Sequence, residues 1–252
     1  MMLPSGLCVG LDPDVTLFPE PLRETRHIAS FLRQIIEATS HVAKAYKINT
    51  AFFEQYGAEG VAMLYQVRDA VGDRFCILDA KRADIGNTSA AYARFLFDTL
   101  QASAVTVAPY MGYDSVAPFL DRGFSYLLAL TSNPGSANFQ RMVVNTPQGP
   151  TPLYKHVIRT AISWKGANNV GFVVGATHPE ELAEIRHEWP AIPLLIPGLG
   201  TQGAGATETS HANNHGPALF NVGRSILYAS SASDYVQAAA EQAENFANAL
   251  SQ

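Results

Sequence analysis

The sequence has little of several features that mark large classes of protein. Of its 252 residues, only two are cysteine and 15% are charged. Two cysteines in a chain of this length predict no disulfide framework. No stretch approaches the roughly 20 consecutive apolar residues of a membrane span. The first six residues also lack the positive charge and apolar run of a signal peptide. Together these absences predict a soluble, cytoplasmic protein.

Positive charge is scarce as well. Lys and Arg together number 17 against 22 Asp and Glu, which gives a formal net charge of -5. The chain contains no run of basic residues, whereas a nucleic-acid surface requires a basic patch. The charge balance therefore argues against nucleic acid as a partner.

What the sequence does contain is a repeated alternation of two patterns. Hydrophobic residues make up 47% of the chain, which is ample for a large core. Short, almost continuous apolar runs alternate about eight times with longer segments of helical periodicity. Strands that are apolar on both faces are typical of a parallel sheet covered by helices. The strand candidates are residues 7–11, 45–49, 75–79, 104–107, 126–130, 170–174, 193–196 and 219–222. The clearest helical windows are 28–45, 58–71, 89–100, 154–164 and 180–188, with a last helix behind the cap candidates Ser233 and Asp234.

Eight β/α units in a chain of this length fit a single (β/α)8 TIM barrel spanning residues 1–252. A doubly wound open sheet is the alternative, but no Gly-x-Gly-x-x-Gly motif follows the first strand candidate. No linker or low-complexity segment divides the chain. We therefore predict one TIM-barrel domain.

Residues 78–88, Leu-Asp-Ala-Lys-Arg-Ala-Asp-Ile-Gly-Asn-Thr, are the most informative segment. Asp79 and Lys81 lie two residues apart at the end of a predicted strand, so their side chains share a face. Asp84 follows three residues later, before a turn and a helix. An ammonium group between two carboxylates is thus placed at the strand end where TIM barrels carry catalytic groups. Taken alone, these charges also fit a salt-bridged, solvated strand end.

Other predicted strands end in polar residues too, and the barrel brings all these ends to one face. Stability alone does not require such a convergence, so it favours a functional site. The polar residues at the other strand ends are Asp12, Lys47, Asn49, Thr131, Ser132, Asn133, Gln202 and Arg224, and Gly223 precedes the last of them.

Two of the strand ends suit a phosphate group. Gly198-Leu199-Gly200 follows the seventh strand candidate, and Gly223-Arg224 follows the eighth. TIM barrels often bind phosphate with these two loops, and an arginine can donate two parallel N–H bonds to phosphate oxygens. Residues 203–217 are small and polar without apolar periodicity. They predict a mobile lid over the ligand, with a disordered excursion as the alternative.

Three histidines are candidates for functional groups. His211 and His215 have the i, i+4 spacing of a zinc pair. That pair requires a helix and a third ligand, and the surrounding Asn-Asn and Gly-Pro disfavour the helix. We therefore expect no metal site there, and we expect His178 to be a turn or cap residue rather than a base.

Together these motifs resemble those of the orotidine 5′-phosphate decarboxylase family, particularly its longer bacterial type. The Asp-x-Lys-x-x-Asp core is shared with sugar-phosphate enzymes on the same barrel, whereas Ile-Gly-Asn-Thr at 85–88 and Ser-Asn-Pro-Gly at 132–135 favour the decarboxylase. Two departures are Ala83, where glycine is usual, and Ala108, where asparagine is common; neither removes a charged group. The similarity runs almost the length of the chain and includes residues 9–13, 47–54, 79–88, 109–115, 131–136, 197–202 and 223–225.

The resemblance implies a homodimer that converts orotidine 5′-phosphate to uridine 5′-phosphate and CO₂ in pyrimidine biosynthesis, without metal or cofactor. Lys81 would protonate C6, Asp79 would lie beside the departing carboxylate, and Lys47 would bind Asp79 and the ribose. Asp84 and Thr88 would reach into the partner subunit's site. The other implied contacts are Asp12 on the ribose, Ser132 on the pyrimidine, Gln202 between base and phosphate, and Gly223 and Arg224 on the phosphate.

Two other functions stay open from the sequence. One is a sugar-phosphate aldolase or decarboxylase of the same superfamily, which would use the Asp-x-Lys-x-x-Asp core around a divalent metal. The other is a catalytically silent barrel that binds a nucleotide or sugar phosphate as a sensor.

Overall fold

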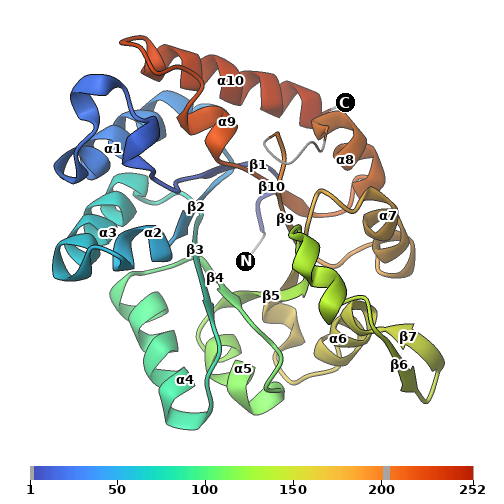
Figure 1. The fold of residues 1–252 in the computed structure, drawn as a ribbon. Coiled ribbons are helices and arrows are strands. Elements are labelled where there is room, and N and C mark those ends of the chain that lie inside the picture. The colour runs from blue at the N-terminus through green and yellow to red at the C-terminus, as the bar shows by residue number, and fades with distance from the viewer. Residues whose placement is uncertain (1–2, 201–204, 252) are drawn as a thin grey trace.

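In the computed structural model, which describes residues 3–200 and 205–251, eight parallel strands close into a barrel (Figure 1). The order around the barrel is β1-β10-β9-β8-β5-β4-β3-β2. The chain is therefore the TIM barrel that the sequence predicts. The strands are β1 (Gly6–Gly10), β2 (Ala45–Asn49), β3 (Cys76–Arg82), β4 (Ala104–Val107), β5 (Phe124–Leu130), β8 (Val170–Val174), β9 (Leu194–Pro197) and β10 (Ala218–Val222).

All eight strand candidates overlap observed strands, and β2, β4 and β8 match residue for residue. These strands are recognisable because both of their faces are buried, so apolar residues run through them almost without a break. The largest difference is in β3, which continues three residues further than expected, to Arg82. As a result β3 itself carries both Asp79 and Lys81.

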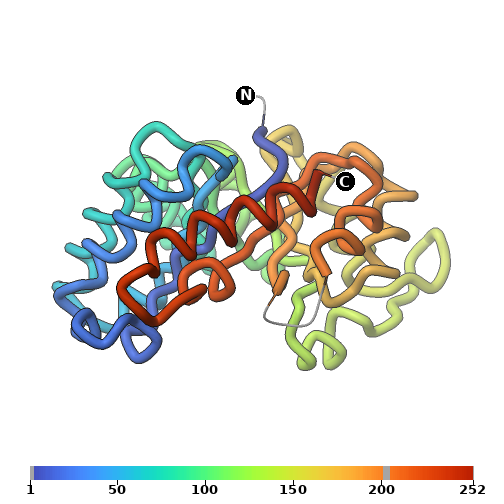
Figure 2. Tube along the Cα trace, turned by 90° about the horizontal axis from the view of Figure 1, so that it is seen from above, coloured from blue at the N-terminus to red at the C-terminus, as the bar shows by residue number. Residues whose placement is uncertain are grey.

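The interior of the barrel is packed toward the N-terminal ends of the strands. One buried apolar cluster takes a member from every barrel strand, and Leu3 packs against it. This packing leaves the other end of the barrel for a ligand. Figure 2 shows the N-terminal segment at one end and the turns that follow β1 and β5 at the opposite end. The cluster consists of Cys8, Ala45, Ile77, Ala104, Phe124, Tyr126, Val173, Leu195 and Leu219.

Helices surround the barrel, and α1 illustrates why the sequence forms them. Phe31, Leu32, Ile35 and Ile36 recur at helical spacing and are buried against the sheet. None of the described helices is long and apolar enough to cross a membrane. The helices are α1 (Ile28–Thr39), α2 (Ala51–Glu54), α3 (Gly57–Val71), α4 (Gly86–Ala93), α5 (Tyr113–Leu120), α6 (Leu153–Ala161), α7 (Pro179–Glu188), α8 (Ala206–Asn213), α9 (Arg224–Leu227) and α10 (Tyr235–Leu250), with a π-helix at Arg94–Thr99.

The structure corrects several expected element boundaries. The first helix ends at Thr39 rather than at residue 45, because the chain turns there and enters β2. The window 89–100 is an α-helix that begins at Gly86 and continues as a π-helix from Arg94. The antiparallel hairpin of β6 (Val143–Thr146) and β7 (Gly149–Pro152) was not predicted, and it projects from the barrel beside α6 (Figure 1).

The expectation that no helix forms around His211 is wrong. Residues 206–213 form α8, whose Thr209 and Asn213 are buried. Asn214 ends the helix in the left-handed conformation, and His215 beyond it also has a positive φ of 57°. His211 and His215 therefore do not share a helix. The function of this region as a lid stays a prediction, and residues 203 and 204 lie outside the described residues.

A buried arginine fixes α8 to the barrel. Arg186 is 2% exposed, and its Nε donates to Asn213 Oδ1 at 2.7 Å. Its terminal nitrogens donate to the carbonyls of Ile192 at 2.6 Å and Pro217 at 2.8 Å. One guanidinium group thus links α7, α8 and the segments that lead into β9 and β10. Burial lowers the pKa of Arg186 to about 10.

We predict that Arg186→Ala lowers the free energy of unfolding by about 3 kcal/mol, because it leaves several buried acceptors without a donor. Urea unfolding followed by circular dichroism measures this loss. Arg33→Ala, at an exposed position of α1, is the control and should change stability by less than about 0.5 kcal/mol. Equal stabilities of the two variants would contradict the assignment.

Candidate active site

A cavity of about 540 Å³ opens at the C-terminal ends of the strands. Side chains or loops from every barrel strand line it, so the predicted convergence of polar strand ends is confirmed. The polar lining residues are Asp12, Lys47, Asn49, Asp79, Lys81, Thr106, Thr131, Ser132, Asn133, Gln140, Asn221 and Arg224.

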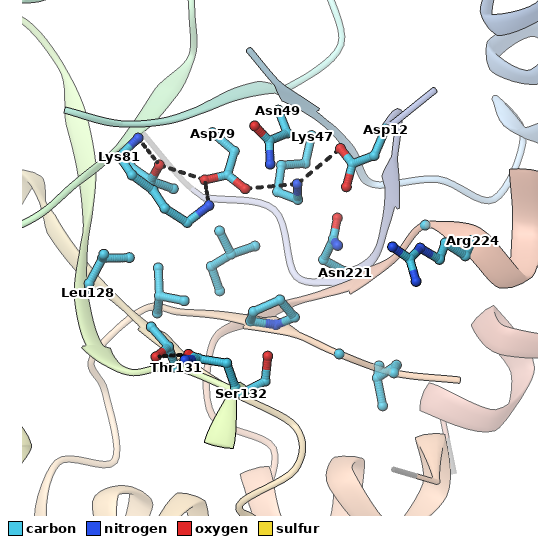
Figure 3. Close-up of a pocket in the computed structure, with 18 of the residues that line it drawn as sticks. Asp12, Lys47, Asn49, Asp79, Lys81, Leu128, Thr131, Ser132, Asn221 and Arg224 are labelled. Carbon is cyan, nitrogen blue, oxygen red and sulfur yellow. Dashed lines mark hydrogen bonds and ion pairs between the residues drawn. The ribbon is translucent and has the colours of Figure 1, made fainter. Parts of the chain in front are cut away.

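The centre of the cavity is a chain of alternating charges (Figure 3). Lys47 Nζ lies 3.4 Å from Asp12 Oδ1 and 3.0 Å from Asp79 Oδ2. The other oxygen of Asp79 accepts from Lys81 Nζ at 2.6 Å. The side chains of Lys47 and Asp79 are 4% and 9% exposed, whereas that of Lys81 is 46% exposed. Two buried ions therefore hold a third, accessible one at the cavity.

Mutual attraction keeps the buried members of this chain of alternating charges ionised. Burial alone would lower the pKa of Lys47, but the carboxylates of Asp12 and Asp79 outweigh it and raise that pKa. Burial alone would raise the pKa of Asp79, but the ammonium groups of Lys47 and Lys81 outweigh it and hold that pKa well below its usual range. The pair consequently remains ionised at neutral pH.

Thr106 on β4 is a member of the site that the sequence analysis missed. It is 1% exposed, and its hydroxyl donates to Asp79 Oδ1 at 2.8 Å. The hydroxyl oxygen of Thr106 in turn accepts the backbone N–H of Lys81 at 2.9 Å. Lys81 has a φ of 44°, a conformation that is uncommon for residues other than glycine. Thr106 therefore fixes both the carboxylate and the unusual backbone that carries the lysine.

The loop after β5 is braced from two sides. Gln140 Oε1 accepts the N–H of Thr131 at 2.7 Å, and the imidazole of His178 lies 3.0 Å from the Thr131 carbonyl. Thr177 Oγ1 donates to the carbonyl of Ser132 at 3.2 Å. His178 occupies the N-cap position of α7, as expected for a cap residue. Gln140 was not identified from the sequence, since its partner is nine residues away within the same irregular connection between β5 and β6.

The loops after β9 and β10 meet at the other side of the cavity. Gly200 has a φ of 82°, and a Cβ there would lie 2.4 Å from Ser225 Oγ, so only glycine fits. Arg224 begins α9, and its exposed guanidinium lines the cavity. Within residues 3–200 and 205–251 it forms no ion pair with a carboxylate, which leaves it available to an anion. Gln202 lies outside the described residues.

Asp84 and Thr88 do not line this cavity. Asp84 follows β3, where its carboxylate accepts the N–H of Ile85 at 2.8 Å. Thr88 is exposed on α4. Among the described residues, no three His, Cys, Asp or Glu side chains form a group that could hold a metal ion.

Comparison with known proteins identifies the family to which the chain belongs. The model of the "Orotidine 5'-phosphate decarboxylase / HUMPS family" matches residues 5–242. The chain belongs to this family. It is 43% identical over 247 residues to the orotidine 5'-phosphate decarboxylase of Herpetosiphon aurantiacus, covering 96% of this chain and 91% of that protein. The structure of Leishmania donovani OMP decarboxylase superposes with a TM-score of 0.82 at 37% identity and covers 98% of this chain and 95% of that one. Leishmania donovani UMP synthase gives a TM-score of 0.85 at 39% identity, and the match spans 98% of this chain and 54% of that longer one.

The charge chain predicts a specific dependence of stability on pH. Because the pKa of Asp79 is lower in the folded state than in the unfolded state, its pairing stabilises the fold above a pH of about 4. That contribution is lost as the pH falls toward the folded-state pKa. We therefore expect the free energy of unfolding of the wild type to fall more steeply between about pH 5 and pH 2.5 than that of Asp79→Asn.

Urea unfolding at successive pH values measures the two slopes. Asp98→Asn is the control, because Asp98 is 52% exposed and pairs with Arg122 on the surface. It should keep the wild-type slope. If Asp79→Asn also kept that slope, the pairing would not stabilise the folded state.

Proposed function

We propose that the chain decarboxylates orotidine 5′-phosphate to uridine 5′-phosphate and CO₂, the activity named for its relatives. The observation that carries this proposal is the accessible ammonium of Lys81, held 2.6 Å from a buried carboxylate at the cavity. Family membership and the guanidinium of Arg224, which lines the same cavity, support it. We also propose a cytoplasmic location for the protein.

The chemistry requires a fixed positive charge near C6. Loss of CO₂ leaves an electron pair in the plane of the pyrimidine ring, where the π system delocalises it poorly. A preorganised cation in a site shielded from water stabilises such a charge without reorganisation. Lys81 supplies that cation and then transfers one proton from Nζ to C6, which leaves a neutral amine that water reprotonates.

Asp79 and the phosphate contacts act on this step in different ways. Asp79 anchors Lys81 and, beside the substrate carboxylate, adds a repulsion that CO₂ loss relieves; we treat this as secondary to stabilisation of the anion. Ser132 binds the pyrimidine, and Asp12 and Lys47 bind the ribose. Arg224 with Gly223 and Gln202 binds the phosphate, whose binding energy supports closure of the site.

We infer a homodimer whose subunits share their active sites. Asp84 and Thr88 do not line the cavity of their own subunit, which leaves them available to a second subunit. Apolar side chains near them are exposed to an unusual degree: Ile85 is 58%, Tyr110 90% and Met111 42% exposed. Burial of these residues against a second copy would bring Asp84 to the neighbouring site.

The alternative within the superfamily is a metal-dependent sugar-phosphate enzyme. The loss of absorbance of orotidine 5′-phosphate, measured in EDTA, separates the two functions. We expect turnover to be unaffected by the chelator. No turnover of this substrate with or without divalent metal would contradict the proposal.

We predict that Lys81→Ala lowers kcat at least about 10⁴-fold, roughly 5 kcal/mol of barrier, because the stabilising cation and the proton donor are both lost. Arg224→Ala should instead raise KM by about 10- to 100-fold with a smaller change in kcat. The absorbance assay gives both constants. Lys165→Ala, at an exposed position that does not line the cavity, is the control and should match the wild type. Near-normal turnover by Lys81→Ala would remove the role assigned to Lys81.

Mixing two inactive variants tests the shared site. Lys81→Ala and Asp84→Ala dimers that exchange subunits form some sites with both wild-type residues, if Asp84 acts in the neighbouring subunit. We expect the mixture to recover up to about a quarter of wild-type activity, following random pairing of subunits. Each variant incubated alone is the control. A mixture as inactive as its components would show that Asp84 does not act across subunits.

A further inference from the structure

One polar group in the cavity has no partner in the ion network. Asn221 on β10 lines the cavity and is 7% exposed, and its side-chain Oδ1 is buried without a hydrogen bond among the described residues. An unpaired buried amide destabilises a fold and is rare in native proteins. Its presence at the strand end next to Gly223 and Arg224 calls for a partner that arrives with the ligand.

The backbone around Asn221 is shaped to hold it beside Lys47. β10 and β2 are the two neighbours of β1, and Gly10 of β1 is in register with Lys47. A Cβ at Gly10 would lie 3.1 Å from Asn221 Oδ1 and 3.3 Å from its Nδ2. The glycine therefore leaves the space that the amide occupies. Figure 3 shows the amide oxygen directed toward Lys47 and Asp12.

Among the described residues, Lys47 has one N–H without an acceptor, and Asn221 has an oxygen without a donor. An ammonium group carries three N–H donors. Two of them point to Asp12 and Asp79, and the third has no acceptor within the described part of the chain. Lys47 thus needs an acceptor where Asn221 needs a donor. A single hydroxyl group supplies both.

We propose that a sugar hydroxyl of the nucleotide bridges Lys47 and Asn221, which makes Asn221 a ligand-binding residue and a determinant of sugar specificity. This inference rests on the proposed function. The phosphate cannot replace the hydroxyl, because an ionised phosphate oxygen accepts but does not donate. The sugar lies between the base, near Ser132 and Lys81, and the phosphate, near Arg224. The soft terminal torsion of the amide lets it turn toward the hydroxyl.

The test compares the binding of uridine 5′-phosphate with that of its 2′-deoxy and 3′-deoxy forms, by calorimetry in EDTA. Asn221→Leu keeps the approximate volume but removes both polar atoms. We expect it to weaken uridine 5′-phosphate binding about tenfold. The deoxy nucleotide that lacks the bridging hydroxyl should bind the wild type and the variant equally. The ligand-free variant should unfold at the wild-type temperature or above, since an unpaired amide has been removed.

Ser125→Ala is the matched control. It also removes a buried polar atom without a partner, on β5 and away from the cavity, and it should bind all three nucleotides as the wild type does. If Asn221→Leu does not fold, Asn221→Ala gives the same comparison. Wild-type affinity of the variant for all three nucleotides would overturn the inference, as would an equal loss for all three. Failure of the wild type to bind uridine 5′-phosphate would instead overturn the proposed function on which it rests.

Discussion

The carboxylate of Asp79, placed between two lysines, is the interaction on which the rest of the site depends. Lys47 is almost fully buried, and a buried ammonium without a counter-charge costs several kcal/mol. Asp79 offsets that cost with one oxygen and orients Lys81 with the other. Thr106 restrains the same carboxylate from the neighbouring strand. The accessible cation is therefore held by groups that themselves cannot move freely.

The barrel permits this arrangement because its apolar packing and its polar site lie at opposite ends. Apolar side chains from all eight strands fill the interior toward the N-terminal ends, so the opposite end can carry buried charge. At that end β3 departs from regular geometry: its register with β4 shifts between Leu78 and Arg82, and Lys81 has a positive φ. On the outer face Arg82 pairs with Glu54 and lies 5.0 Å from the ring of Tyr92, which anchors the strand next to its irregular residue. Such local irregularity is common where function requires it.

The sequence alone predicted those features that depend on the residues of one short segment. Continuous apolar runs located every barrel strand, and the i, i+2 spacing placed Asp79 and Lys81 on one face. The helix at Ala206–Asn213 was missed because its small polar residues have no apolar stripe, and it is held by the distant Arg186 instead. Thr106 was missed for a related reason. Its role depends on which residues lie opposite on the neighbouring strand β3, and a single sequence does not contain that register.

A crystal structure with bound uridine 5′-phosphate tests the central claim most directly, because it locates C6 relative to the charge chain. We expect Lys81 Nζ to lie within about 3.5 Å of C6, still bonded to Asp79, with the phosphate at Arg224. A nucleotide bound in the cavity with Lys81 turned away from C6 would contradict it.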